Sequence, residues 1–110
     1  MNDGGDCFVV AGHYVLEHPN TILVHGIVEG QGQLTGVLFS HAWVESGSTV
    51  IDKSNGNNIK MERKLYYHFG KIQEKYLKKY SHKQATEYML KEAHWGPWDK
   101  VLFSWKIKRK

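Results

Sequence analysis

The chain has 110 residues, 41% apolar and 13% aromatic, which suits one domain with its own core and excludes a disordered protein. Its single cysteine excludes an intramolecular disulfide and a cysteine-rich zinc site, and it fits a reducing compartment. No run approaches the ~18 consecutive apolar residues of a membrane span, and no secretory signal is visible. We therefore expect one soluble, cytoplasmic domain over residues 1–110.

Charge is divided unevenly along the chain, although the net charge is only +4. Residues 1–52 contain six acidic residues and no Lys or Arg, whereas residues 53–110 contain all fifteen basic residues and five acidic ones. Such a division can provide a surface for nucleic acid or an acidic protein, but the lysines follow no recognised nucleic-acid motif. We favour basic solvent-facing helices, and keep a non-catalytic module that binds an anionic partner as the alternative function.

The first predicted element is a helix from Cys7 to Glu17. The run is apolar on most sides, and Pro19 ends it because the residue before a proline avoids the helical region. Asp6 at its start is a good N-cap residue type. A buried strand has a similar composition, but the run is longer than a typical strand. Gly12, unfavourable inside a helix, predicts that another element approaches the backbone closely there.

Three strands are predicted next, as an antiparallel meander over residues 21–29, 36–45 and 49–53. Gly47 and Ser48 form a two-residue loop between the last two strands, which a glycine in the first loop position favours. This register places Trp43 opposite Asp52. His41 then lies on the same face as Asp52, as its diagonal neighbour at ~7 Å.

The second half is predicted from weaker patterns. Residues 59–70 favour no single conformation, whereas residues 71–80 carry an apolar stripe typical of a helix. Ser81 and Gln84 form a capping box that begins another helix. Residues 101–108 alternate as a last strand. The residues expected to face inward on the two helices are Ile72, Tyr76, Ala85, Tyr88 and Met89.

Cys7, His41 and Asp52 together could supply a thiol nucleophile. A neutral thiol is a poor nucleophile, but a helix N-terminus beneath it and an imidazolium beside it favour the thiolate. Asp52 would hold the orientation and tautomer of the imidazole, leaving the other ring nitrogen for the thiol. The alternative is a buried core cysteine, a core histidine and an acid near a turn.

The order of these residues resembles a known group. Gly-Asp-Cys opens the apolar helix, and His-Ala-Trp-Val-Glu is followed by Val-Ile-Asp on the next strand, over residues 4–53. This resembles the transglutaminase-like group of papain-fold cysteine enzymes. The resemblance implies a compact α+β papain-like domain, with an N-terminal nucleophile helix packed on a small antiparallel sheet and additional C-terminal helices.

The resemblance also implies roles for individual residues. Cys7 would be the nucleophile, His41 the general base and acid, and Asp52 the residue that orients His41. The group includes thiol proteases, amidases, deamidases and transamidases, so the expected substrate is a peptide, a protein or an amide-containing small molecule. The expected chemistry is acyl transfer through a thioester, without a cofactor.

Other residues are weaker candidates for the site. Trp43 is expected to line the substrate site beside the thiol, and the backbone N–H of Cys7 to stabilise the oxyanion, with Asn2 as a side-chain candidate. No zinc-motif spacing occurs among the histidines, so no metal is expected. The metal-ligand set considered as an alternative is His25, His41 and Glu45.

Overall fold

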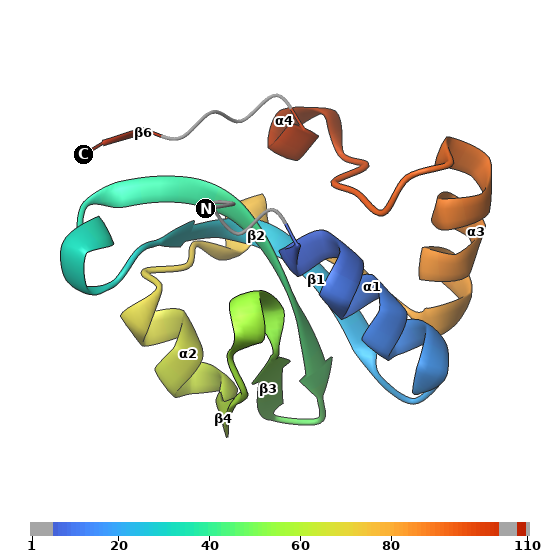
Figure 1. Cartoon of the computed structure of the whole chain (residues 1–110), viewed down its shortest axis with the longest axis horizontal. Helices are drawn as coiled ribbons and strands as arrows, with labels where there is room; N and C mark the ends of the chain where they lie inside the picture. Colours follow the sequence, from blue (N-terminus) through green and yellow to red (C-terminus); the bar gives the residue numbers. More distant parts are fainter. Residues whose placement is uncertain (1–5, 104–107, 110) are drawn as a thin grey trace.

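The computed structural model, which describes residues 6–103 and 108–109, has helices on both faces of an antiparallel sheet (Figure 1). The sheet has the order β4-β3-β2-β1-β5, with β6 paired to β2. Its strands are β1 (Ile22–Glu29), β2 (Val37–Ser46), β3 (Thr49–Asp52), β4 (Ile59–Glu62), β5 (Lys78–Tyr80) and β6 (Lys108–Arg109). The helices are α1 (Cys7–Glu17), α2 (Arg63–Phe69), α3 (His82–Glu92) and α4 (Lys100–Phe103). The 3₁₀ turns are η1 (Gly32–Leu34), η2 (Ser54–Gly56) and η3 (Glu74–Tyr76).

The β2–β3 hairpin has the predicted register. Ser46 pairs with Thr49, and two further pairs continue the ladder to Val44 and Ile51. Gly47 in the turn has a φ of +61°, in the left-handed region that favours glycine. Because side chains alternate between the faces of a strand, this register sends His41, Trp43 and Asp52 to the same face.

The two faces of the sheet are covered by different helices (Figure 1). On one face, α1 and α3 pack on strand residues, in a core formed by Cys7, Ala11, Val15, Leu23, Ala42, Val44, Ile51, Tyr80 and Ala85. On the other face, α2 and the segment after it pack on Val24, Val28, Trp43 and Val50. We call these the α1 face and the α2 face. In the described part of the chain, no helix is both long and apolar enough to cross a bilayer.

Several predictions for the helices are confirmed. α1 spans the expected residues, and the capping box of Ser81 and Gln84 is present at the start of α3. A Cβ atom on Gly12 would lie 2.6 Å from the Trp95 ring and 2.9 Å from the Met89 methyl group. The close approach inferred from Gly12 is therefore that of α3 and the residues after it.

The predicted helix over residues 71–80 is wrong. These residues form η3 and β5, the edge strand beside β1, in which Tyr80 pairs with Leu23 of β1. Leu77 packs on the α2 face, whereas Tyr80 packs on the α1 face. The apolar side chains therefore serve two cores on opposite sides of the sheet, and an extended chain at the sheet edge satisfies both.

The predicted strand over residues 101–108 is also wrong in its first part, where α4 forms instead. Asp99 starts this helix, because its carboxylate accepts the N–H groups of Val101 (2.9 Å) and Leu102 (3.4 Å). This local cap outweighs the alternating pattern. Residues 104–107 lie outside the described residues, and Lys108–Arg109 form the short strand β6.

His25 is a buried polar side chain in the core of the α1 face. It is 0% exposed, and neither ring nitrogen has a hydrogen-bond partner among residues 6–103 and 108–109. The rings of Phe8, Trp98 and Tyr80 surround it at centroid distances of 4.8, 5.0 and 5.1 Å. Burial lowers the pKa of His25 to about 3, so its imidazole is neutral at neutral pH.

We expect His25 to make the fold sensitive to acid. Its pKa is lower in the folded chain than in the unfolded chain (~6.5), so the unfolded state binds more protons between these values. The free energy of unfolding should therefore fall as the pH drops from 6.5 toward 3, by on the order of 5 kcal/mol in total. Urea titrations of the wild type and of His25→Leu between pH 6.5 and 4.5 should show a flatter profile for the variant. Equal slopes would contradict a neutral buried His25.

Candidate active site

His41 and Asp52 form a buried pair at the end of β3. The His41 Nε2–H donates to Asp52 Oδ2 at 2.9 Å, and the two residues are 8% and 5% exposed. The pair follows from the hairpin register, since β3 leaves the sheet directly after Asp52. The same-face geometry expected from the sequence is therefore confirmed.

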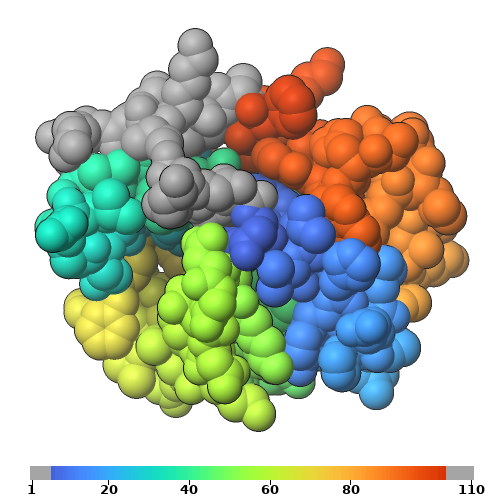
Figure 2. Space-filling view, viewed as in Figure 1, coloured from blue at the N-terminus to red at the C-terminus, as the bar shows by residue number. Residues whose placement is uncertain are grey.

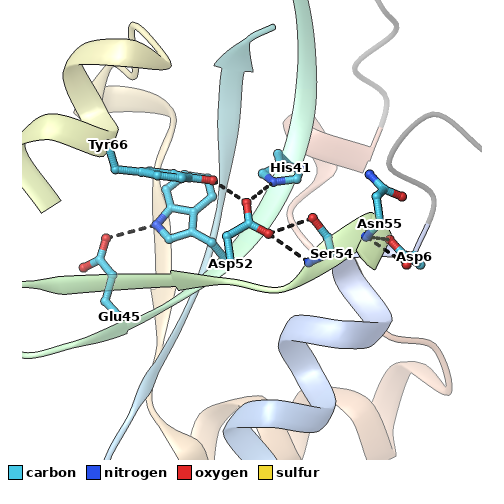
Figure 3. A network of polar contacts seen from close by, with 8 residues as sticks. Asp6, His41, Glu45, Asp52, Ser54, Asn55 and Tyr66 are labelled. Carbon is cyan, nitrogen blue, oxygen red and sulfur yellow. Dashed lines mark hydrogen bonds and ion pairs between the residues drawn. The ribbon is translucent and has the colours of Figure 1, made fainter. Parts of the chain in front are cut away.

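Both carboxylate oxygens of Asp52 accept hydrogen bonds from neighbouring residues (Figure 3). Oδ1 accepts from the Ser54 hydroxyl at 2.7 Å and the Ser54 N–H at 3.0 Å, and Oδ2 accepts from the Tyr66 hydroxyl at 2.7 Å as well as from His41. Burial raises the pKa of this carboxyl, but His41, Ser54 and Tyr66 lower it more and hold it well below the usual range. Asp52 is therefore ionised and fixed in orientation.

The same interactions act in reverse on His41. Burial lowers its pKa, but the hydrogen bond to Asp52 and the nearby Cys7 sulfur outweigh burial and raise the pKa to about 9. Nδ1, the nitrogen turned away from Asp52, is buried, and apart from the nearby Cys7 it has no hydrogen-bond partner among the described residues. His41 is therefore an imidazolium at neutral pH, with Nδ1 left for the thiol.

Cys7 reaches this pair from the other face of the sheet. It is the first residue of α1, and the Asp6 carboxylate before it accepts the Asn55 N–H at 3.0 and 3.1 Å. This contact ties the start of α1 to η2, the turn that follows Asp52. The pairing between β2 and β3 ends at Val44 and Ile51, so no residue of β3 is paired with His41 of β2. The start of α1 thus lies beside the open end of the His41–Asp52 pair.

A second buried acid, Glu45, lies near the His41–Asp52 pair and holds Trp43, the residue that packs against His41. Glu45 accepts the Trp43 indole N–H at 3.1 Å and the Tyr67 hydroxyl, and Lys79 lies 3.2 Å from its other oxygen. Trp43 is 0% exposed, and its ring stacks with that of His41 at a centroid distance of 6.1 Å. In this structure Trp43 packs against His41, and its role in substrate binding stays a prediction.

α2 supplies residues that the sequence did not assign to the site. Its neighbouring tyrosines reach different acids, Tyr66 to Asp52 and Tyr67 to Glu45. The sequence of residues 59–70 favoured no conformation, so nothing indicated that Tyr66 would lie over β3. Ser54 carried a signal, since a serine two residues after an aspartate is common where the aspartate bonds its own turn.

A cavity of about 670 Å³ opens beside His41 on the α2 face. It lies between the sheet, α2 and η2, and Figure 2 shows a hollow where these yellow and green segments meet the teal residues near η1. His41, Asp52 and Tyr66 line its inner end. Cys7 is 1% exposed and borders a separate small space that shares Asp52 and Ser54 with this cavity. Asp52 and Ser54 therefore lie between this cavity and the space beside the sulfur.

The remaining candidates are placed as follows. Asn2 lies outside the described residues. His25 is on the α1 face, whereas His41 and Glu45 are on the α2 face. The sheet therefore separates His25 from the other two candidate ligands. Among residues 6–103 and 108–109, no three His, Cys, Asp or Glu side chains are grouped as metal ligands.

The basic second half pairs partly with the chain's own acids. Lys78 lies 3.5 Å from Asp99, and Lys79 lies 3.2 Å from Glu45. Both lysines belong to residues 71–80, the segment that was expected to be a helix, and both lie on the edge strand β5 instead. Binding of an anionic partner stays a prediction that these contacts do not favour.

Comparisons with known proteins give no further guide to the chemistry. A scan against protein-family models, a search of curated proteins and a search of solved structures each found no match to this chain. The function proposed below is therefore based on the geometry of this site.

We expect Asp52→Asn to lower the pKa of His41 strongly. Without the carboxylate, burial still lowers the pKa of His41 and only Cys7 remains to raise it. NMR titration of the His41 ring protons should therefore show the pKa falling well below its wild-type value of about 9. Glu45→Gln is the matched control, because it neutralises a buried acid nearby that has no hydrogen bond to His41. A His41 pKa unchanged by Asp52→Asn would contradict the assigned pair.

Proposed function

We propose that this protein is a cysteine-dependent acyl-transfer enzyme that forms a thioester on Cys7. The observation that carries the proposal is the buried His41–Asp52 pair, which holds an imidazolium with Nδ1 free beside the only cysteine of the chain. A helix N-terminus and an imidazolium both favour a thiolate. The order of helix, sheet and helices also supports the transglutaminase-like, papain-fold group as its class.

In the first step the Cys7 thiolate attacks the carbonyl carbon of an amide or ester. The oxyanion that forms takes a hydrogen bond from the backbone N–H of Cys7, since the first N–H groups of a helix have no acceptor within the helix. His41 Nδ1–H then donates its proton to the leaving nitrogen or oxygen as the carbon–heteroatom bond breaks. The products are a Cys7 thioester and a free amine or alcohol.

In the second step the thioester is transferred to water or to an amine. Neutral His41 takes a proton from the attacking group, and the carbon–sulfur bond breaks to restore the thiolate and the imidazolium. Water gives hydrolysis or deamidation, whereas an amine gives transamidation. Asp52 stays ionised throughout and holds the ring, with Ser54 and Tyr66 fixing Asp52 in turn.

The shielded thiol adds one requirement to this reaction. Cys7 is 1% exposed, so the boundary of Asp52 and Ser54 must open before a carbonyl group reaches the sulfur. The backbone N–H of Asn55, bonded to Asp6, is at the exposed side of this boundary. A shift of η2 relative to α1 would therefore uncover the thiol, and while the Ser54 bonds are open the Tyr66 and His41 hydrogen bonds keep Asp52 in place.

The proposal predicts that an activated acyl donor acylates Cys7. Treatment with 4-nitrophenyl acetate should add one acetyl group that peptide mapping places on Cys7 and that neutral hydroxylamine removes, as expected for a thioester. His41→Ala should slow this acylation by roughly 10²- to 10⁴-fold, because general acid–base catalysis contributes about that much.

Two variants separate acylation at the site from chemical labelling of surface lysines. Cys7→Ser should lose the hydroxylamine-sensitive acetyl group, whereas Lys83→Gln, on the exposed start of α3, should keep the wild-type rate. Acetylation confined to lysines, at a rate indifferent to His41, would overturn the proposed function.

A further inference from the structure

The cavity beside His41 is lined mostly by apolar side chains, with Glu29, Gln31, Asn55 and Asn57 also among its lining residues. Apart from its inner end, its walls are largely side chains from β1, β2, β4 and α2, including Val28, Val37, Phe39, Ile59, Met61 and Phe69. These side chains project from the α2 face, where α2 crosses the sheet without filling the space beneath it. Leu34 and Phe69 are about half exposed at its walls, at 48% and 50%. The cavity thus offers an apolar surface that reaches from solvent to the candidate catalytic pair.

α2 is held across this cavity at two places. Near its middle, Tyr66 donates to Asp52. At its C-terminal end, the Gln31 side-chain amide donates to the Phe69 carbonyl at 2.5 Å, and the Glu29 N–H donates to the Gly70 carbonyl at 2.7 Å. These bonds fix the position of α2 over the sheet, so the space beneath it is part of the fold.

The described residues that line the cavity favour an uncharged occupant. No Lys or Arg is among the described residues that line it, so it offers no cation to an anionic group. Its two acids are both engaged: Asp52 by its four donors, and Glu29 by the Gly36 N–H at 3.1 Å and Lys71 at 3.7 Å. An uncharged apolar group is the occupant whose removal from water on entering this cavity costs the least free energy.

The size of the cavity indicates how large this group is. At about 670 Å³ it falls within the range of roughly 300–1,000 Å³ found for sites that hold whole small molecules. We infer that the substrate carries an uncharged aliphatic acyl chain, which fills this cavity and places its carbonyl carbon at the His41–Asp52 end. This inference rests on the proposed function and names the acyl donor as a fatty acyl amide or ester.

A chain-length series tests the inference. The rate of Cys7 acylation should be measured with 4-nitrophenyl esters from acetate to decanoate, used below their micelle concentrations. We expect kcat/KM to rise by up to about fourfold per methylene, the gain for burying one methylene, until the cavity is full. A rate independent of chain length, with acetate still acylating Cys7, would overturn the aliphatic substrate and leave the proposed function intact.

A cavity-filling variant tests the location. Met61→Trp should lower kcat/KM for the decanoyl ester at least tenfold and leave the acetyl ester within about twofold, because only the long chain needs the occupied space. Leu90→Trp, which places the same ring on an 81% exposed position of α3, is the control and should change neither rate. Equal losses for both esters in Met61→Trp, with an unchanged melting temperature, would contradict the placement.

A binding measurement keeps the inference testable if no ester acylates Cys7, which would overturn the proposed function. Decanamide, which is uncharged and carries the same chain, should bind the wild-type protein in a calorimetric titration and should bind Met61→Trp at least tenfold more weakly. Absence of decanamide binding to the wild-type protein would overturn the cavity as an aliphatic site.

Discussion

The candidate site depends on the hydrogen bonding of one carboxylate, that of Asp52. Asp52 is the last residue of β3, and its carboxylate receives donors from β2, η2 and α2. Because an isolated buried charge is very costly, the donors and the acid stabilise one another, and loss of one leaves the others unsatisfied. The position of the imidazole of His41 is thus fixed by contacts made on four separate elements.

His25 and His41 show how strongly a partner decides the behaviour of a buried histidine. Both belong to the central hairpin, and both are almost excluded from water. His25 is surrounded by aromatic rings, and burial lowers its pKa to about 3, whereas Asp52 and Cys7 raise the pKa of His41 to about 9. Opposite charge states at neutral pH therefore arise on opposite faces of one sheet. The first histidine serves the core, and the second is prepared for proton transfer.

The sequence predicted the first half of the fold well, because local signals and tertiary packing agree there. Gly47 set the hairpin register, and the register alone brought His41 to Asp52. In the second half the same signals failed, because the apolar residues of 71–80 serve two cores and Asp99 caps α4 against the alternating pattern. Tyr66 and the cavity were not foreseen, since both arise from where α2 crosses the sheet, which no spacing in the sequence encodes.

The central claim is that Cys7 is paired as a thiolate with the His41 imidazolium. Thiolate absorbance at 240 nm tests this directly, because it needs no access to the buried sulfur and the chain has a single cysteine. The difference between the wild type and Cys7→Ser should show a thiolate at pH 7 that disappears in His41→Ala. A difference spectrum without thiolate at pH 7, or one that His41→Ala leaves unchanged, would contradict the pairing and the mechanism built on it.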